Sequence, residues 1–103
     1  MTTRLAYRQI GEALEERREF TGNTMDGRYV VELDRSDLGQ LPSLYQDMMY
    51  RDAAAAHEAG LPFYVVYSYW TPIAWAYGDT VRVPEARYSV TTSRHQGMLY
   101  RLK

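Results

Sequence analysis

The sequence predicts a small α+β domain, in which a mostly antiparallel sheet of three to four strands packs with two or three helices. Residues 63–77 carry no charged side chain and hold seven of the chain's fourteen aromatic residues, a composition typical of strands at the centre of a sheet. Before this run, two segments repeat apolar residues at helical spacing. Within and after it, two reversal signals, at residues 71–72 and 78–79, divide the chain into short hairpin strands.

Length and composition indicate one folded unit. At 103 residues, with 46% hydrophobic and 24% charged residues, we take residues 1–103 as a single domain of a soluble protein. No apolar stretch reaches the roughly 18 residues that cross a bilayer, and the first residues lack the apolar run of a signal peptide. Cysteine is absent, which fits a reducing compartment. We therefore expect a cytoplasmic protein without a membrane partner.

A first helix is expected from Thr2 or Thr3, either of which can cap it, to about Phe20. Gly22 then stands where a helix C-terminal glycine is common. The apolar stripe of this helix has four members at helical spacing, Ala6, Ile10, Ala13 and Leu14. Turn-forming residues at 23–27 predict a reversal, and the alternation at 28–33 predicts a short strand.

A loop at residues 34–42 leads into a second helix with marked ends. Ser43 and Gln46 have the spacing of a capping box, Gly60 lies at the C-terminal cap, and Pro62 blocks continuation. The buried face of this helix is expected to consist of Tyr45, Met48, Met49, Ala53 and Ala56, with Leu44 and Ala59 at its margins.

A reversal at Thr71-Pro72 assigns the side chains of the central run to two sheet faces. One face then holds Phe63, Val65, Tyr67, Tyr69, Ala74 and Ala76. The other face holds Tyr64, Val66, Ser68, Trp70, Ile73, Trp75 and Tyr77. Proline is unusual at the second position of such a turn, so a register one residue away, which exchanges the faces of the second strand, stays open.

The Gly78-Asp79 pair is a hairpin signal that places Trp75 opposite Arg82 and starts a third strand at residues 80–83. It also places Tyr77 opposite Thr80. A helix is expected to cover the face that carries Ala74, Ala76, Val81 and Val83. After this strand, an extended segment from residue 88 is expected to run into a short helix. Thr92 or Ser93 would cap that helix, which would carry Met98, Leu99 and Leu102.

Two blocks are distinctive, Tyr67-Ser-Tyr-Trp-Thr-Pro-Ile-Ala-Trp75 and Tyr88-Ser-Val-Thr-Thr-Ser-Arg-His-Gln96, preceded by Phe20-Thr-Gly-Asn-Thr-Met25. In them the sequence resembles a group of small proteins encoded by actinobacterial phages and related mobile elements. Trp70 stands where glycine is usual in that group, and the loop and helix at 34–62 look like an insertion relative to its shortest members. The resemblance implies a phage or prophage origin and expression in a bacterial cytoplasm. It brings no activity with it.

His95, beside Thr92, Ser93 and Arg94, is the constellation on which a catalytic interpretation would rest. A histidine base and a hydroxyl nucleophile also need an orienting group and oxyanion donors, for which no motif is present. The favoured interpretation is that the hydroxyls cap a helix and that His95 and Gln96 make structural hydrogen bonds. An anion at this helix start is the alternative. Because His57 and His95 stand apart and cysteine is absent, we expect no metal and no cofactor.

Aromatic density is the strongest functional signal, because tyrosine and tryptophan supply binding hot spots. If helices cover only the alanine face, the other face forms one exposed patch of Tyr64, Trp70, Trp75, Tyr77 and Arg82. The second candidate binding segment contributes Tyr88, Thr92, Arg94, His95 and Gln96. The sequence therefore predicts a non-enzymatic binding module for a protein partner, which would be a host factor, a phage factor or a second copy of the chain.

Two other functions stay open at this point. Nucleic-acid binding would use Arg82, Arg87, Arg94 and the exposed aromatic residues. The charge is uneven, since residues 1–60 hold seven Arg against eleven acidic residues and residues 79–103 hold five basic residues against two acidic ones. Nucleic-acid binders usually carry a larger basic excess, which makes this alternative the less favoured one. The third possibility is a small hydrolase that uses His95.

Overall fold

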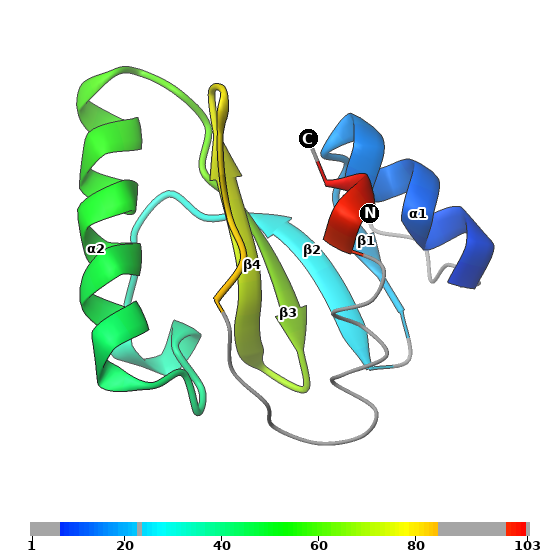
Figure 1. The fold of residues 1–103 in the computed structure, drawn as a ribbon, viewed down its shortest axis with the longest axis horizontal. Coiled ribbons are helices and arrows are strands. Elements are labelled where there is room, and N and C mark those ends of the chain that lie inside the picture. The colour runs from blue at the N-terminus through cyan, green and yellow to red at the C-terminus, as the bar shows by residue number, and fades with distance from the viewer. Residues whose placement is uncertain (1–6, 23, 85–98, 103) are drawn as a thin grey trace.

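The computed structural model describes residues 7–22, 24–84 and 99–102, which form an α+β fold around an antiparallel sheet (Figure 1). The sheet has five strands in the order β1-β2-β3-β4-β5, so neighbours in the sheet follow each other along the chain. The elements are α1 (Tyr7–Glu16), β1 (Phe20–Thr21), β2 (Met25–Tyr29), η1 (Arg35–Asp37), α2 (Ser43–Glu58), β3 (Tyr64–Ser68), β4 (Thr71–Tyr77), β5 (Thr80–Arg82) and η2 (Leu99–Arg101). The predicted fold class is confirmed, with one strand more than the upper expectation.

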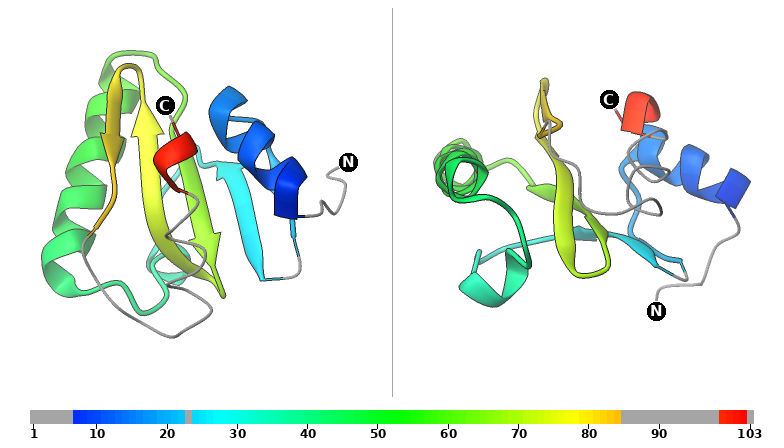
Figure 2. Two further views of the ribbon diagram at one scale, coloured as in Figure 1. Left: turned by 45° about the vertical axis from the view of Figure 1, so that its right-hand side comes forward. Right: turned by 60° about the horizontal axis from the view of Figure 1, so that its bottom comes forward.

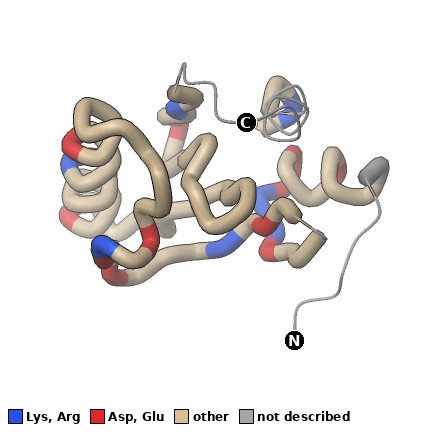
Figure 3. The backbone as a smooth tube through the Cα atoms, turned by 90° about the horizontal axis from the view of Figure 1, so that it is seen from below, with Lys and Arg blue, Asp and Glu red and all other residues tan. Residues whose placement is uncertain are grey.

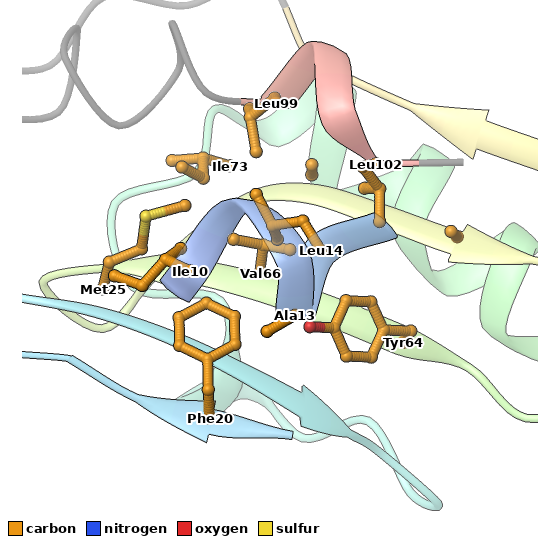
Figure 4. Close-up of a cluster of buried hydrophobic side chains, with 12 residues drawn as sticks. Ile10, Ala13, Leu14, Phe20, Met25, Tyr64, Val66, Ile73, Leu99 and Leu102 are labelled. Carbon is orange, nitrogen blue, oxygen red and sulfur yellow. The ribbon is translucent and has the colours of Figure 1, made fainter. Parts of the chain in front are cut away.

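Helices cover both faces of this sheet, with α1 and η2 on one side and α2 on the other (Figures 1 and 2). The α1 side buries Ile10, Ala13, Leu14, Phe20, Met25, Tyr64, Val66, Ile73, Ala74, Ala76, Leu99 and Leu102 (Figure 4). The α2 side buries Leu38, Leu41, Met49, Ala56, Phe63, Val65, Tyr67 and Trp75. The aromatic side chains of the central run are therefore divided between two cores. None of the described helices is long and apolar enough to cross a membrane.

Helix α1 buries Ile10, Ala13 and Leu14 of the expected stripe, whose fourth member, Ala6, lies outside the described residues. The helix ends earlier than the sequence suggests. Arg17 takes the left-handed conformation that ends the helix, with φ of 50°, and the Arg18 N–H donates to the Ala13 carbonyl at 2.8 Å. Phe20 then starts β1, where it pairs with Gly27 and is buried in the core. The helix predicted to reach Phe20 and the cap predicted at Gly22 were both wrong, because burial of Phe20 favours a strand there.

Strand β2 occupies residues that the sequence assigned to a turn. Gly27 pairs with Phe20 on one side and with Val66 on the other. A Cβ on Gly27 would overlap Tyr64 Oη and Phe20 Cε1, so this glycine makes room for two aromatic rings. The turn predicted at 23–27 and the strand predicted at 28–33 were therefore wrong in position. Glycine here serves side-chain packing across the sheet.

Helix α2 matches its predicted C-terminus. Gly60 has φ of 68° at the expected cap, and the Leu61 N–H donates to the Ala56 carbonyl at 2.9 Å. The predicted capping box is absent, because Pro42 is the N-cap and the Gln46 side chain donates to the Leu41 carbonyl at 2.6 Å. Met49 and Ala56 are buried, and Tyr45, Met48 and Ala53 pack partly buried beside them, as predicted. The marginal members Leu44 and Ala59 are exposed.

The β3–β4 hairpin turns at residues 69–70, two residues before the predicted reversal. Ser68 pairs with Thr71, and the register shifts between Val66 and Tyr67. This irregularity exchanges the faces of β4, so Trp75 lies with Val65 while Ala74 and Ala76 face α1. Ala74, Trp75 and Ala76 thus face as in the alternative that the sequence left open, but the register is neither of the two predicted, because the turn lies two residues earlier.

The β4–β5 hairpin confirms its predicted register. Trp75 pairs with Arg82, and Tyr77 pairs with Thr80. Gly78 has φ of 52°, a conformation that glycine adopts without strain. At the C-terminus, Leu99, the first residue of η2, and Leu102, which directly follows η2, are buried as expected and pack against α1, whereas Met98 lies outside the described residues. The proposed caps of that helix, Thr92 and Ser93, lie outside the described residues.

Candidate functional site

The β3–β4 turn presents two aromatic side chains to solvent in an unfavourable backbone conformation. Tyr69 has φ of 48° and Trp70 has φ of 71°, which together define a type I′ turn. Asparagine and glycine normally fill these positions, because a left-handed conformation costs other residues about 1–2 kcal/mol each. Trp70 is 72% exposed, and Tyr69 is also exposed. We refer to Tyr69 and Trp70 as the aromatic turn.

Neighbouring segments hold the aromatic turn in place. The Tyr69 N–H donates to the Thr24 carbonyl at 2.9 Å. On the other side, the Gln40 N–H donates to Thr71 Oγ1 at 3.0 Å, and a Cβ on Gly39 would come within 2.6 Å of the Trp70 carbonyl oxygen. The backbone of Tyr69 and the neighbouring Thr71 thus hold the turn against the segments at Thr24 and at Gly39–Gln40.

A buried carboxylate on α2 organises the other predicted binding residues. Asp52 is 6% exposed and accepts hydrogen bonds from Trp75 Nε1 at 2.7 Å, Tyr77 Oη at 3.0 Å and Arg82 Nε at 3.2 Å. The hydrogen bond from Arg82 and the charge of Asp52 raise the pKa of that guanidinium. Because both carboxylate oxygens accept hydrogen bonds from side chains of the sheet, this cluster fastens α2 to β4 and β5.

The predicted single patch does not form, because helices cover both faces of the sheet and the predicted members are divided between these faces. Tyr64 is buried under α1, whereas Trp75 and Tyr77 lie on the α2 side. Arg82 is partly exposed beside Asp52, and Trp70 stands at the turn. The other candidates, Tyr88, Thr92, Arg94, His95 and Gln96, lie outside the described residues.

Sequence reasoning missed Asp52 as a functional position, although a signal was present. Asp52 lies one helical turn from both Met48 and Ala56, so it is an acid on the apolar face of a helix. Such a residue is rarely buried without partners, and tryptophan with tyrosine on the facing strand could have been proposed as donors. Among the described residues, no group of three or more His, Asp or Glu side chains could hold a metal ion.

Tyr67 and Arg28 form a second buried polar pair on the α2 side. The Arg28 guanidinium carbon lies 4.2 Å from the centroid of the Tyr67 ring. Tyr67 Oη and Arg28 Nε are buried without a hydrogen-bond partner in the part of the chain that the structure describes. Burial raises the pKa of Tyr67 to about 12.

The substitution Tyr67→Phe is expected to stabilise the protein by about 1 kcal/mol, because it removes a buried hydroxyl that has no partner. The matched substitution Tyr64→Phe is expected to destabilise it by about 1 kcal/mol, since Tyr64 Oη donates to the Arg18 carbonyl at 2.7 Å. Urea unfolding of both variants measures the difference. Equal effects of the same sign would contradict this assignment.

Stability is also expected to fall at alkaline pH. Burial raises the pKa of both Tyr64 and Tyr67 above 10.0, so the unfolded chain releases these protons first as the pH rises. The free energy of unfolding is then undiminished below about pH 10 and falls above it, by about 1.4 kcal/mol per pH unit for each tyrosine. Urea titrations between pH 8 and about 12 test this, and Tyr67→Phe should lower the slope.

The comparisons with known proteins identify a family and nothing more specific. No curated protein and no solved structure matches the chain. Residues 9–101 match a family of unknown function, DUF8033. This match extends over both helices and all five strands of the sheet apart from the start of α1. The chain therefore belongs to this family of unknown function.

Proposed function

We propose that this protein is a phage- or prophage-encoded binding module without enzymatic activity, and that it docks on a protein partner through the aromatic turn. The observation that carries the proposal is the exposed tryptophan in a left-handed conformation, Trp70. The phage origin rests on the resemblance of the blocks at residues 67–75 and 88–96. The partner is a host or phage factor, or a second copy of the chain.

Strain at an exposed position supports a binding role. A buried residue can be held in an unfavourable conformation by packing, but the Trp70 side chain stands in solvent. Glycine at this position would relieve the backbone strain and remove an exposed apolar surface. Residues that persist in such conformations cluster at sites of function. Tryptophan and tyrosine on a rigid turn also bind with little loss of side-chain freedom.

Charge favours a protein partner over nucleic acid. In the described part of the chain, the basic positions are interspersed with acidic ones, and Arg17 and Arg18 are the two that adjoin in sequence (Figure 3). Arg18, Arg82 and Arg101 each pair with a carboxylate. A strand of nucleic acid needs a continuous basic groove beside its stacking residues, so this distribution makes it the second candidate.

The described groups also favour binding over hydrolysis. The carboxylate of Asp52 accepts hydrogen bonds from three donors that belong to the fold. Burial raises the pKa of Tyr64 and Tyr67, which keeps both protonated near neutral pH. His95, on which the hydrolase alternative rests, lies outside the described residues. The described side chains of Asp52, Tyr64 and Tyr67 thus serve to hold the fold together.

The test is a pull-down from an actinobacterial lysate, with and without nuclease, that compares the wild type with Trp70→Gly. We expect Trp70→Gly to stabilise the fold by about 1 kcal/mol, because glycine accepts the left-handed conformation. The same substitution should weaken partner capture by more than about tenfold, as expected for a tryptophan hot spot. Tyr100→Ala is the matched control, since Tyr100 is 80% exposed on η2 and away from the turn.

Two outcomes would contradict the proposal. Capture of the same protein by Trp70→Gly and the wild type would remove the aromatic turn from the interface. Recovery of nuclease-sensitive material alone would favour nucleic acid, whose binding should also weaken steeply as salt is raised.

A further inference from the structure

A pocket of about 170 Å³ lies at the end of the sheet opposite the aromatic turn. Its walls come from the chain after β2, from the C-terminal half of α2 and from the segment before β3. The lining residues include Val31, Leu33, Ala53, His57, Leu61 and Phe63. Phe63 directly precedes β3, whereas the aromatic turn directly follows it, so the two surfaces are separated by the length of that strand. We call this feature the His57 pocket.

The size of the His57 pocket suits one side chain. Sites for small-molecule ligands usually measure about 300–1,000 Å³, which is well above the volume found here. The rim is apolar and open to solvent, since Val31 is 89% exposed, and Leu61 is exposed as well. An apolar rim around a hollow is typical of a surface that receives an apolar group from a partner.

Three exposed carboxylates adjoin this apolar rim along the chain or beside Leu61. Glu32 stands between the lining residues Val31 and Leu33, and Glu58 follows His57. Asp79 follows Gly78, where a Cβ would lie 3.0 Å from Leu61 Cδ1. Glu32, Glu58 and Asp79 are all exposed, and none of them forms an ion pair within the described residues.

The carboxylate of Glu19 adds negative charge on the same side. It accepts a hydrogen bond from the N–H of Tyr29, which also lines the pocket, at 3.2 Å. The nearby Arg18 guanidinium is paired with Glu16 at 2.9 Å. An acidic rim attracts cationic groups and repels anionic ones, which selects among partners that carry the same apolar side chain.

We propose that the His57 pocket is a second binding site, which receives one apolar side chain from a protein segment that carries Lys or Arg on both sides of it. The apolar side chain fills the pocket, and the flanking cations face Glu32, Glu58 and Asp79. This site does not depend on the aromatic turn, so either surface can be disproved without affecting the other.

The test is a titration of the ¹⁵N-labelled protein with three short peptides, followed by NMR chemical shifts. The probes are Lys-Arg-Leu-Arg-Lys, the same peptide with serine in place of leucine, and Glu-Glu-Leu-Glu-Glu. We expect saturable shifts at Val31, His57 and Leu61 with the first peptide. Affinity should fall by about tenfold or more for each of the other two peptides. The serine peptide lacks the apolar side chain, and the glutamate peptide lacks the flanking cations.

Protein variants distinguish binding in the pocket from general electrostatic attraction to the surface. Ala53→Leu fills the pocket and should weaken binding of the first peptide by about tenfold, whereas Ala54→Leu, on the exposed face of the same helix turn, should not. The double substitution Glu32→Gln with Glu58→Gln should weaken binding and reduce its salt dependence without touching the core. Equal binding of the leucine and serine peptides, unchanged binding by Ala53→Leu, or absence of shifts at millimolar peptide would each overturn the proposal.

Discussion

Replacement of Asp52 by alanine is expected to lower the free energy of unfolding by about 3 kcal/mol. The substitution leaves the indole N–H of Trp75, which is fully buried, without an acceptor. It also removes the acceptor of the Tyr77 hydroxyl. Each buried donor without a partner costs about 1–3 kcal/mol. The side chain of Arg82 is 47% exposed, so its ion pair with Asp52 contributes less than about 1 kcal/mol.

Urea unfolding monitored by far-ultraviolet circular dichroism measures this loss. Asp47→Ala, at an exposed position one turn earlier in α2, is the control and should change stability by less than about 0.5 kcal/mol. Arg82→Ala should also have a small effect. If Arg82→Ala were as damaging as Asp52→Ala, the cluster would depend on its ion pair rather than on satisfaction of the Trp75 N–H.

Substitution of Gly27 by alanine is expected to destabilise the protein by about 3 kcal/mol, at the upper end for overpacking of a core. The added methyl group would overlap Tyr64 Oη and Phe20 Cε1, and both of those residues are fully buried. Relief of the overlap would move Phe20 away from β2 or break the hydrogen bond from Tyr64 to Arg18. Strand pairing and helix docking would therefore weaken together.

Gly60→Ala separates this steric effect from backbone strain. Gly60 has φ of 68°, and no atom lies within 4 Å of the position of an added Cβ. Only the left-handed conformation opposes alanine there, at a cost of about 1 kcal/mol. Thermal and urea unfolding of the two variants should rank Gly27→Ala as clearly the more damaging. The reverse order would mean that the aromatic rings around Gly27 rearrange at low cost.

Glycine at position 70, the residue that the resemblance to phage proteins leads us to expect there, would fit the turn geometry. The second central residue of a type I′ turn has a positive φ, which glycine adopts without strain. In this chain Trp70 holds that conformation with φ of 71°. The sequence could show that Trp70 departs from the pattern. Only the structure shows that the departure costs conformational energy, and this cost makes the aromatic turn the strongest candidate for a binding surface.

The sequence by itself determined the features that depend on neighbours along the chain. The apolar faces of both helices, the cap at Gly60 and the pairing of Trp75 with Arg82 follow from spacings of a few residues. Local sequence specifies such features because helical periodicity and a two-residue turn act within one or two turns of chain. These elements were sufficient to predict the α+β class.

Tertiary structure decided the features in which distant segments compete for the same space. Burial of Phe20 against Gly27 turned the expected end of α1 into β1. The register shift between β3 and β4 placed Trp75 under α2, where Asp52 accepts its N–H. The predicted aromatic patch was therefore covered, and Trp70, at the turn, is the aromatic member of that patch that stays exposed. Such features depend on how well whole sheet and helix faces pack and on which buried polar groups find hydrogen-bond partners. The pattern of residues close in sequence contains neither kind of information.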